Sequence, residues 1–300
     1  MIPIAFHPIY RHPLPEGHRF PMLKYELLPQ QLLHEGTSEI ADFYEPEIAN
    51  LDDVLAVHNS SYLNDLLHLT LDPRAARKIG FPLSAELVER ELRIANGTIL
   101  GVQKAFETGI AFNIAGGTHH AYSNRGEAFC LLNDQAIAAQ YLLNNRLAKK
   151  ILIVDLDVHQ GNGTAEIFSN NSSVFTFSMH GKSNYPFKKE MSDLDIALED
   201  HTSDENYLKI LLETLPSLIQ KQKPDVIFYL AGVDILATDK LGKLSCTIEG
   251  CKKRDEMVLE LCLEHQIPVQ VSMGGGYSPE IKTIVEAHAN TFRVAKNMFS

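Results

Sequence analysis

The chain alternates short apolar segments with longer segments of helical periodicity. The strand-like segments are Ile2–His7, Ala111–Ala115, Lys150–Leu156, Ser173–Met179, Asp225–Leu230 and Ile267–Ser272. The helix-like segments are Phe20–His34, Ser84–Glu107, Leu131–Leu147, Asp204–Gln220, Glu249–Glu264 and Pro279–Phe299. Strands that are apolar throughout, such as ILIVDL, belong inside a parallel sheet that is covered on both faces. The alternation predicts an open, doubly wound α/β fold, and with no repeat or long linker we expect one domain over residues 1–300.

Charge and cysteine content narrow the class of protein. The formal net charge of −11 argues against sequence-independent nucleic-acid binding, which needs a basic stripe. The sequence contains no run of about 20 apolar residues and no signal-peptide pattern at its N-terminus. Its four cysteines form no CxxC pair, which is typical of a reduced environment. We therefore expect a cytoplasmic protein with no membrane span and no direct nucleic-acid partner; its oligomeric state is left open.

Polar and glycine-rich clusters follow five of the predicted strands. They are GGTHH, DLDVHQGNG, SMH, AGVD and MGGGY, in chain order. Parallel sheets bind ligands at the carboxyl ends of their strands. We therefore expect the five clusters to converge on one rim.

In an extended strand, side chains two residues apart point to the same face. The side chains of Asp155, Asp157 and His159 should therefore share one face at the end of their strand. A lone Asp here would often only cap the next helix. Three polar residues ending a buried strand are costly unless they are satisfied, and they favour a divalent metal. Asp234, at the end of another apolar strand, completes an Asp-His-Asp set. Three protein ligands leave tetrahedral zinc one open position, as in catalytic sites.

Two further motifs favour amide hydrolysis. His119 and His120 follow two glycines, and paired imidazoles beside a metal and its water can act as general base and general acid. An exposed loop pair or a second metal site remains an alternative. Tyr277, after three glycines, can donate to an oxyanion if its turn faces the metal, although such a Tyr is often a surface aromatic. Phe129 fits either the core or the mouth of a narrow pocket.

Taken together, these residues resemble the zinc-dependent histone deacetylase family from about His7 to the last helix. The resemblance is carried by HPIYRHPLPEGH, VHNSSYL, GGTHHA, GEAFCLLND, DLDVHQGNG, FSMH, AGVDIL and MGGGY. HQGNG, the segment Asn184–Pro186 and DILATDKLGKLS are similar to the class IV branch. The resemblance implies the arginase/deacetylase fold, a single α/β domain with a central eight-stranded parallel sheet and helices on both faces.

The resemblance also implies roles for individual residues. Asp157, His159 and Asp234 would bind Zn²⁺, and Fe²⁺ can occupy such a site when zinc is scarce. His120 would be the general base, His119 its electrostatic or general-acid partner, and Tyr277 the group that polarises the carbonyl. Asp155 would orient His119. A structural K⁺ would bind Asp155, the Ser178 hydroxyl and backbone carbonyls that include Met179. The substrate would lie against Phe129, Gly117 and Gly275, with Tyr185 or Phe187 as the opposite wall.

Two departures from the commonest family pattern stand out. Asn162 occupies the position of an Asp that orients the second histidine, and an amide stabilises an imidazolium less than a carboxylate does. No rim Asp that clamps the substrate backbone can be placed, and residues 72–84 are the nearest candidate stretch.

We expect a deacylase that acts on acetyl-lysine or longer acyl-lysine in proteins or peptides. Hydrolysis of a small acylated amine, such as an acetylpolyamine, is the alternative. A binuclear ureohydrolase would need more acidic ligands than these strand ends offer. A non-catalytic acyl-lysine-binding scaffold would lack a ligand, a catalytic His or the Tyr, and all of these are present.

Overall fold

Eight parallel strands form one sheet, in the order β2-β1-β3-β8-β7-β4-β5-β6. The computed structural model describes residues 1–299. The strands are β1 (Ile4–Ala5), β2 (Phe43–Tyr44), β3 (Ile110–Asn113), β4 (Ile151–Asp155), β5 (Val174–Gly181), β6 (Leu194–Leu198), β7 (Val226–Leu230) and β8 (Val269–Ser272). A central eight-stranded parallel sheet is what the family resemblance implies.

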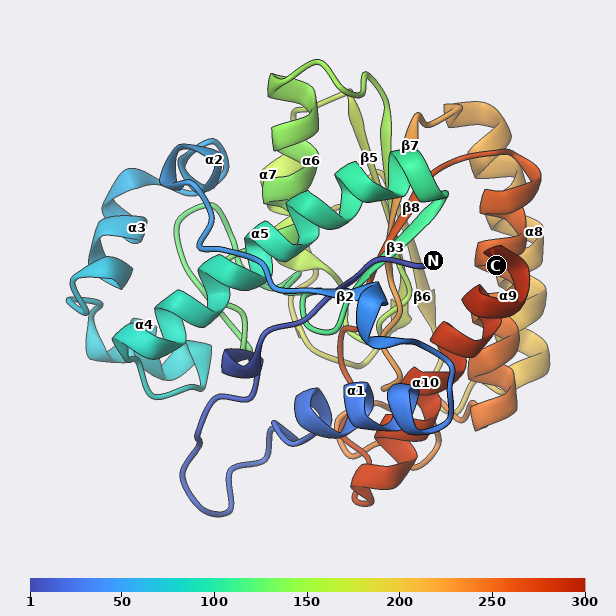
Figure 1. Ribbon diagram of the computed structural model, residues 1–300, viewed down its shortest axis with the longest axis horizontal. Helices are drawn as coiled ribbons and strands as arrows, with labels where there is room; N and C mark the ends of the chain where they lie inside the picture. The colour runs from blue at the N-terminus through green and yellow to red at the C-terminus, as the bar shows by residue number, and fades with distance from the viewer. Residues whose placement is uncertain (300) are drawn as a thin grey trace.

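Helices cover both faces of the sheet (Figure 1). On one side lie α5 (Ala85–Thr108), α6 (Asp134–Asn144) and α7 (Asn162–Phe168). On the other lie α1 (Lys24–His34), α8 (Asp204–Gln222), α9 (Ile248–Glu264) and α10 (Ile281–Phe299). Three short helices stand beside the outer end of α5: α2 (Leu51–Leu55), α3 (Ser60–Leu67) and α4 (Pro73–Ile79). Single 3₁₀ turns occur at Pro8–Tyr10 and Ile40–Asp42.

All six strands expected from the sequence are present, and two more complete the sheet. The additional strands lie at its two edges. β2 is only two residues long, and β6 alternates exposed and half-buried residues, because only one side of it meets the core. Neither segment has the continuous apolar run that marks β4 and β7, which are buried at every position.

Local capping sets several helix boundaries. The helix expected at Leu131–Leu147 starts later, at Asp134, because the Asn133 side chain accepts a hydrogen bond from the Ala136 backbone N–H and caps it. Ser84 caps α5 through the Leu87 N–H in the same way. The helix expected from Phe20 begins at Lys24, after a turn at Pro21.

Strands β3, β8, β7, β4 and β5 are neighbours in the sheet. The motif clusters lie at or just after the carboxyl ends of these strands, and SMH lies among the last residues of β5 itself. Since the strands are parallel, their carboxyl ends lie along one edge. The expected convergence on one rim is therefore confirmed. The sheet order explains it, because segments more than 100 residues apart in sequence end side by side.

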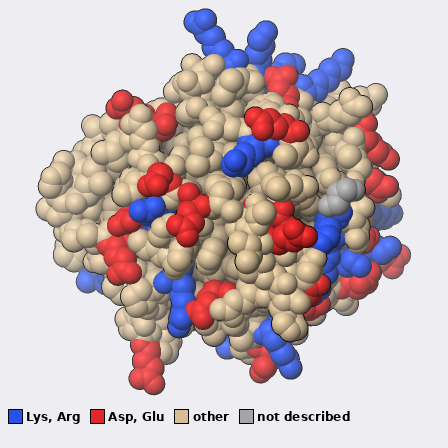
Figure 2. Space-filling model, viewed as in Figure 1, with Lys and Arg blue, Asp and Glu red and all other residues tan. Residues whose placement is uncertain are grey.

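Basic and acidic side chains are interspersed over the face shown in Figure 2, with several basic ones along the upper margin. This face carries no continuous basic stripe. Within residues 1–299, no helix is both long enough and apolar enough to cross a bilayer.

Candidate active site

Three buried residues at the carboxyl ends of β4 and β7 form a cluster that suits a metal ion. One ligand atom each from Asp157, His159 and Asp234 lies within 4.8 Å of the others. Their exposed fractions are 1%, 8% and 0%. Nδ1 of His159 lies 3.0 Å from Oδ1 of Asp157 and 3.1 Å from Oδ2 of Asp234. Two carboxylates and an imidazole are donors that a divalent metal ion accepts, and three protein ligands leave a tetrahedral ion one open position.

Backbone groups hold the two carboxylates in place. The Gly275 N–H donates to Oδ2 of Asp157 at 2.8 Å, and the Val158 N–H donates to Oδ1 of Asp234 at 2.9 Å. A Cβ on Gly275 would stand 2.0 Å from Oδ2 of Asp234. The glycine turn after β8 therefore packs directly on the ligands, and a side chain cannot be accommodated there.

The electrostatics of the cluster favour a cation. Burial lowers the pKa of His159, yet hydrogen bonds to Asp157 and Asp234 raise it to about 10. Burial and the charge of Asp157 raise the pKa of Asp234 to about 7. Both shifts show that two buried carboxylates demand compensating positive charge, which a divalent ion supplies.

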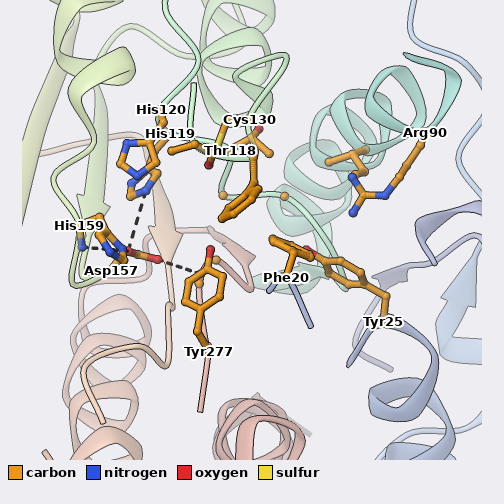
Figure 3. A pocket seen from close by; sticks show the side chains of 17 residues that line it. Phe20, Tyr25, Arg90, Thr118, His119, His120, Cys130, Asp157, His159 and Tyr277 are labelled. Carbon is orange, nitrogen blue, oxygen red and sulfur yellow. Dashed lines mark hydrogen bonds and ion pairs between the residues drawn. The ribbon is translucent and has the colours of Figure 1, made fainter. Parts of the chain in front are cut away.

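His119 and His120 lie beside this cluster, and each has its own hydrogen-bond partner. Nδ1 of His119 is 2.7 Å from Oδ2 of Asp155, and Nδ1 of His120 is 2.6 Å from Oδ1 of Asn162. Figure 3 shows the two rings one behind the other above Asp157 and His159. Both imidazoles therefore have a fixed orientation, as groups that transfer protons require.

The two histidines differ in basicity. Burial lowers the pKa of His119, but Asp155 and Asp157 outweigh it and raise the pKa above its usual range. Burial, with the neighbouring His119 and His159, lowers the pKa of His120 well below that range. Environments that push the pKa values of two neighbours apart are typical of an acid and base pair.

Tyr277 completes the group on the opposite side of the cavity. Its hydroxyl points toward the space below the His pair (Figure 3). The backbone N–H of Tyr277 donates to Oδ2 of Asp239 at 2.6 Å, which fixes the turn. Burial, with the charges of Asp234 and Asp157, raises the pKa of Tyr277 well above 10, so the hydroxyl keeps its proton. It is placed to donate a hydrogen bond to a carbonyl oxygen in the cavity.

Phe129 lines two neighbouring cavities, here called inner and outer, which also share His120, His159 and Tyr277. The inner cavity, about 40 Å³, extends past the histidines to Phe20, Tyr25 and Ile94. The outer one, about 330 Å³, opens between Phe129 and Tyr185. Phe129 has a φ of +69°, and its N–H donates to the Ile79 carbonyl at 2.6 Å. This hydrogen bond helps to hold an unfavourable backbone conformation where an aromatic wall is needed.

The remaining predicted residues fall into three groups. Gly117 and Gly275 line the inner cavity, while Tyr185 and Phe187 line the outer one. The ring of Tyr185 stands 5.0 Å from that of His120, whereas Phe187 is 89% exposed. Ser178 lies opposite Asp155 in the pairing of β5 with β4, and Met179 is fully buried beside it. In the stretch 72–84, Asp72 caps α4 through the Arg74 N–H.

Several site residues were missed by sequence reasoning. Lys24 is buried and donates to the Gly274 carbonyl at 2.8 Å, and burial lowers its pKa to about 8. Arg19 lies over the Phe129 ring at 5.0 Å, and Arg90 lines the inner cavity. A Lys or Arg in a helical or loop segment ordinarily predicts solvent exposure, so no local signal marks them. Tyr122, next to the His pair, carries no signal of its own either.

Comparison with known proteins agrees with the geometry. Residues 18–292 match the model of the histone deacetylase domain. An uncharacterized protein of Picosynechococcus is 45% identical over 99% of both chains. Histone deacetylase 2 of Arabidopsis thaliana is 30% identical over 87% of this chain and 70% of its own. The crystal structure of an HDAC homolog complexed with SAHA superposes with a TM-score of 0.84, at 22% identity, over 99% of this chain and 84% of that one.

The chain belongs to the histone deacetylase family, and it is accordingly a hydrolase of amide bonds.

Proposed function

We propose that this protein is a zinc-dependent lysine deacylase that removes acetyl groups from proteins or peptides. The observation that carries the proposal is the meeting of one buried Asp-His-Asp cluster, two oriented histidines and Tyr277 around a single narrow cavity. Asp157, His159 and Asp234 would hold the zinc. When bound, zinc supplies a Lewis acid and makes a water molecule more acidic.

The side chains of His120, His119 and Tyr277 transfer the protons and stabilise the developing negative charge. His120, the less basic imidazole, accepts a proton from the attacking water through Nε2, since its Nδ1 faces Asn162. His119, whose pKa is raised by Asp155, stabilises negative charge and donates a proton to the leaving amine. Tyr277 donates a hydrogen bond to the carbonyl oxygen as negative charge develops there.

The size of the inner cavity supports a short acyl group. At about 40 Å³, the inner cavity has room for only a few small groups. An acetyl group fits this space, whereas a long fatty acyl chain would require Phe20, Tyr25 or Ile94 to move.

The charges that line the outer cavity favour a peptide substrate over an acetylpolyamine. Of the described residues that line it, Arg19 and Lys243 are cations and none is a carboxylate. Arg19 lies over the Phe129 ring, directly at the entrance. Cations at the mouth repel the additional ammonium groups of an acetylpolyamine. A lysine side chain whose amine is acylated carries no charge and meets no such penalty.

Other parts of the proposal rest on the family resemblance. Residues 1–300 form one catalytic domain, closest to class IV because Asn162 pairs with His120. Asp155, Ser178 and Met179 would hold a structural K⁺; the strand register pairs Asp155 with Ser178, and Met179 follows Ser178 in β5. A cytoplasmic location is a prediction from the reduced cysteines.

The test is hydrolysis by zinc-loaded protein across one panel of substrates. The panel contains acetyl-lysine peptides, myristoyl-lysine peptides and acetylated polyamines, each measured with and without a chelator. We expect chelator-sensitive release from acetyl-lysine peptides and little from the other two. Turnover of polyamines alone would replace the proposed substrate class. If no substrate reacts although zinc is bound, the protein is not a deacylase of these amides and the binding-scaffold interpretation gains support.

A further inference from the structure

An asparagine beside a catalytic histidine raises a problem of orientation. A carboxylate has two equivalent acceptor oxygens, but the Asn162 amide has one acceptor, Oδ1, and one donor, Nδ2. If Oδ1 faces His120, the imidazole carries its proton on Nδ1 and leaves Nε2 free to accept one. If the amide is reversed, Nδ2 donates to Nδ1, the proton moves to Nε2, and His120 cannot act as a base.

A chain of hydrogen bonds leads from His120 to the surface. Nδ1 of His120 lies 2.6 Å from Oδ1 of Asn162, and Nδ2 of Asn162 donates to the Tyr122 hydroxyl at 3.0 Å. The Tyr122 hydroxyl in turn donates to Oε1 of Glu190 at 3.3 Å. Asn162 is fully buried and Tyr122 is 4% exposed.

The donor and acceptor roles along this series of hydrogen bonds follow from the hydrogens that each group carries. The Tyr122 hydroxyl has one hydrogen, and an ionised carboxylate can only accept. When that hydrogen points to Glu190, the hydroxyl offers Asn162 only its lone pairs, so Asn162 must present its NH₂ group. Oδ1 then faces His120. Burial and the charges of Glu190 and Glu127 raise the pKa of Tyr122 to about 12, so the hydroxyl keeps its hydrogen at neutral pH.

Other residues hold Glu190 and Tyr122 in place. The buried amide of Gln160 accepts from the Glu190 N–H at 2.9 Å and donates to the Glu190 carbonyl at 2.8 Å. The guanidinium of Arg125 lies 3.4 Å from the centroid of the Tyr122 ring. The HQGNG segment therefore supplies a metal-ligand candidate, the residue that anchors Glu190 and the amide that contacts His120.

We propose that Tyr122 is a positioning residue that, with Glu190, selects the tautomer of His120 by fixing the orientation of the Asn162 amide. The proposal rests on the proposed function, because a free Nε2 matters only if His120 accepts a proton. Tyr122 itself does not reach the reacting atoms. It compensates for the loss of symmetry that follows when an amide occupies the position of a carboxylate.

The first test observes the tautomer directly and needs no turnover. Zinc-loaded protein with ¹⁵N-labelled histidine is studied by NMR, and the His120 signals are assigned by their loss in His120→Ala. In the unsubstituted protein we expect Nδ1 protonated and Nε2 unprotonated. In Tyr122→Phe we expect both tautomers. An unchanged single tautomer in Tyr122→Phe overturns the proposal, whatever the activity.

The second test is a double-mutant cycle with Asn162→Asp. Because a carboxylate needs no orientation, Tyr122 should become dispensable in that background. With a neutral hydrogen bond contributing on the order of 1 kcal/mol, we expect Tyr122→Phe to lower kcat about fivefold in the Asn162 protein, with KM nearly constant. In the Asn162→Asp protein the same change should lower kcat less than about twofold. Each variant is measured on the plateau of its pH profile.

Tyr62 offers a matched control, since it is also 4% exposed and its hydroxyl donates to the Leu131 carbonyl at 2.8 Å. Tyr62→Phe should have the same effect in both backgrounds and leave the His120 tautomer unchanged. An equal loss of kcat from Tyr122→Phe in both backgrounds would mean that Tyr122 only packs, and would overturn the proposal. Absence of turnover on every substrate would contradict the proposed function while the NMR result still decides the role of Tyr122.

Discussion

Two adjacent histidines differ in basicity because their surroundings differ. The carboxylate of Asp155 outweighs burial and raises the pKa of His119. Burial and the neighbouring His119 and His159 lower the pKa of His120, although its hydrogen bond to Asn162 opposes this shift. The family resemblance predicts these two partners, because it places Asp155 beside His119 and Asn162 at the position of the residue that orients His120. It does not predict Tyr122, because the Asn162–Tyr122 contact joins residues 40 apart in the chain.

Asn162→Asp should change the pH dependence of activity. A carboxylate beside His120 raises its pKa by about 1 unit or more, because it stabilises the imidazolium. A general base is active only when it is unprotonated. On acidification, the variant should therefore lose activity at a higher pH than the unsubstituted protein. The acidic limb of the kcat/KM profile should therefore move upward by about 1 pH unit. If the acidic limb stays at the same pH, a group other than His120 controls it.

Tyr277→Phe should remove a hydrogen bond that forms fully only as charge develops on the carbonyl oxygen. Loss of such a donor typically lowers kcat by about 10²- to 10³-fold. We expect this loss with KM and melting temperature nearly constant. Tyr141→Phe is the control, since its hydroxyl accepts from Gln103 on α5 and Tyr141 is not among the described residues that line either cavity. If Tyr277→Phe lowers kcat less than tenfold, other hydrogen-bond donors stabilise the oxyanion.

Among the elements, buried strands were predictable and edge strands were not. Every residue of β4 and β7 is buried, so an apolar run marks each strand to within about one residue. β2 and β6 have a neighbour on one side only, and their sequences carry no such run. Helices α2, α3 and α4 were also missed, because they are short and pack beside α5 rather than on the sheet.

The turns that follow the strands position the candidate metal ligands. At Gly275 the turn packs so closely on these ligands that a side chain does not fit. Gly275→Ala would place a Cβ 2.0 Å from Oδ2 of Asp234 and 2.8 Å from Oδ2 of Asp157. The carboxylates must move, so we expect zinc affinity to fall about 10- to 100-fold, as for other groups that orient ligands. The measurement is competition with a chelator for zinc.

Gly36→Ala is the control for this substitution. A Cβ at Gly36 meets no atom within 4 Å, although its φ of +72° makes the change unfavourable for the backbone. It should lower stability slightly and leave zinc affinity unchanged. Equal zinc affinity in Gly275→Ala and the unsubstituted protein would contradict the described packing of this turn.

Across the whole molecule, a buried ion pair connects the outer helices to the strand ends. Arg254 and Asp255 of α9 are both fully buried and paired at 2.8 Å. Arg254 donates to the backbone carbonyl of Gly232, after β7, and Asp255 accepts from Thr291 of α10 at 2.8 Å and Tyr229 of β7 at 2.5 Å. The pair therefore joins α9, α10 and β7 just below Asp234.

Arg254→Met should destabilise the protein strongly, because it leaves Asp255 buried without its charge partner. Breaking a buried pair from one side typically costs about 3–5 kcal/mol, which urea unfolding of the zinc-loaded protein would measure. Since Gly232 lies two residues before Asp234, we also expect weaker zinc binding at temperatures where the variant is folded. Lys252→Met, on the same helix but in a partly exposed pair with Glu256 at 3.7 Å, should change stability by less than ~1 kcal/mol. If both variants unfold at the same urea concentration, the buried pair does not stabilise the fold as described; unchanged zinc affinity in folded Arg254→Met would contradict its connection to the site.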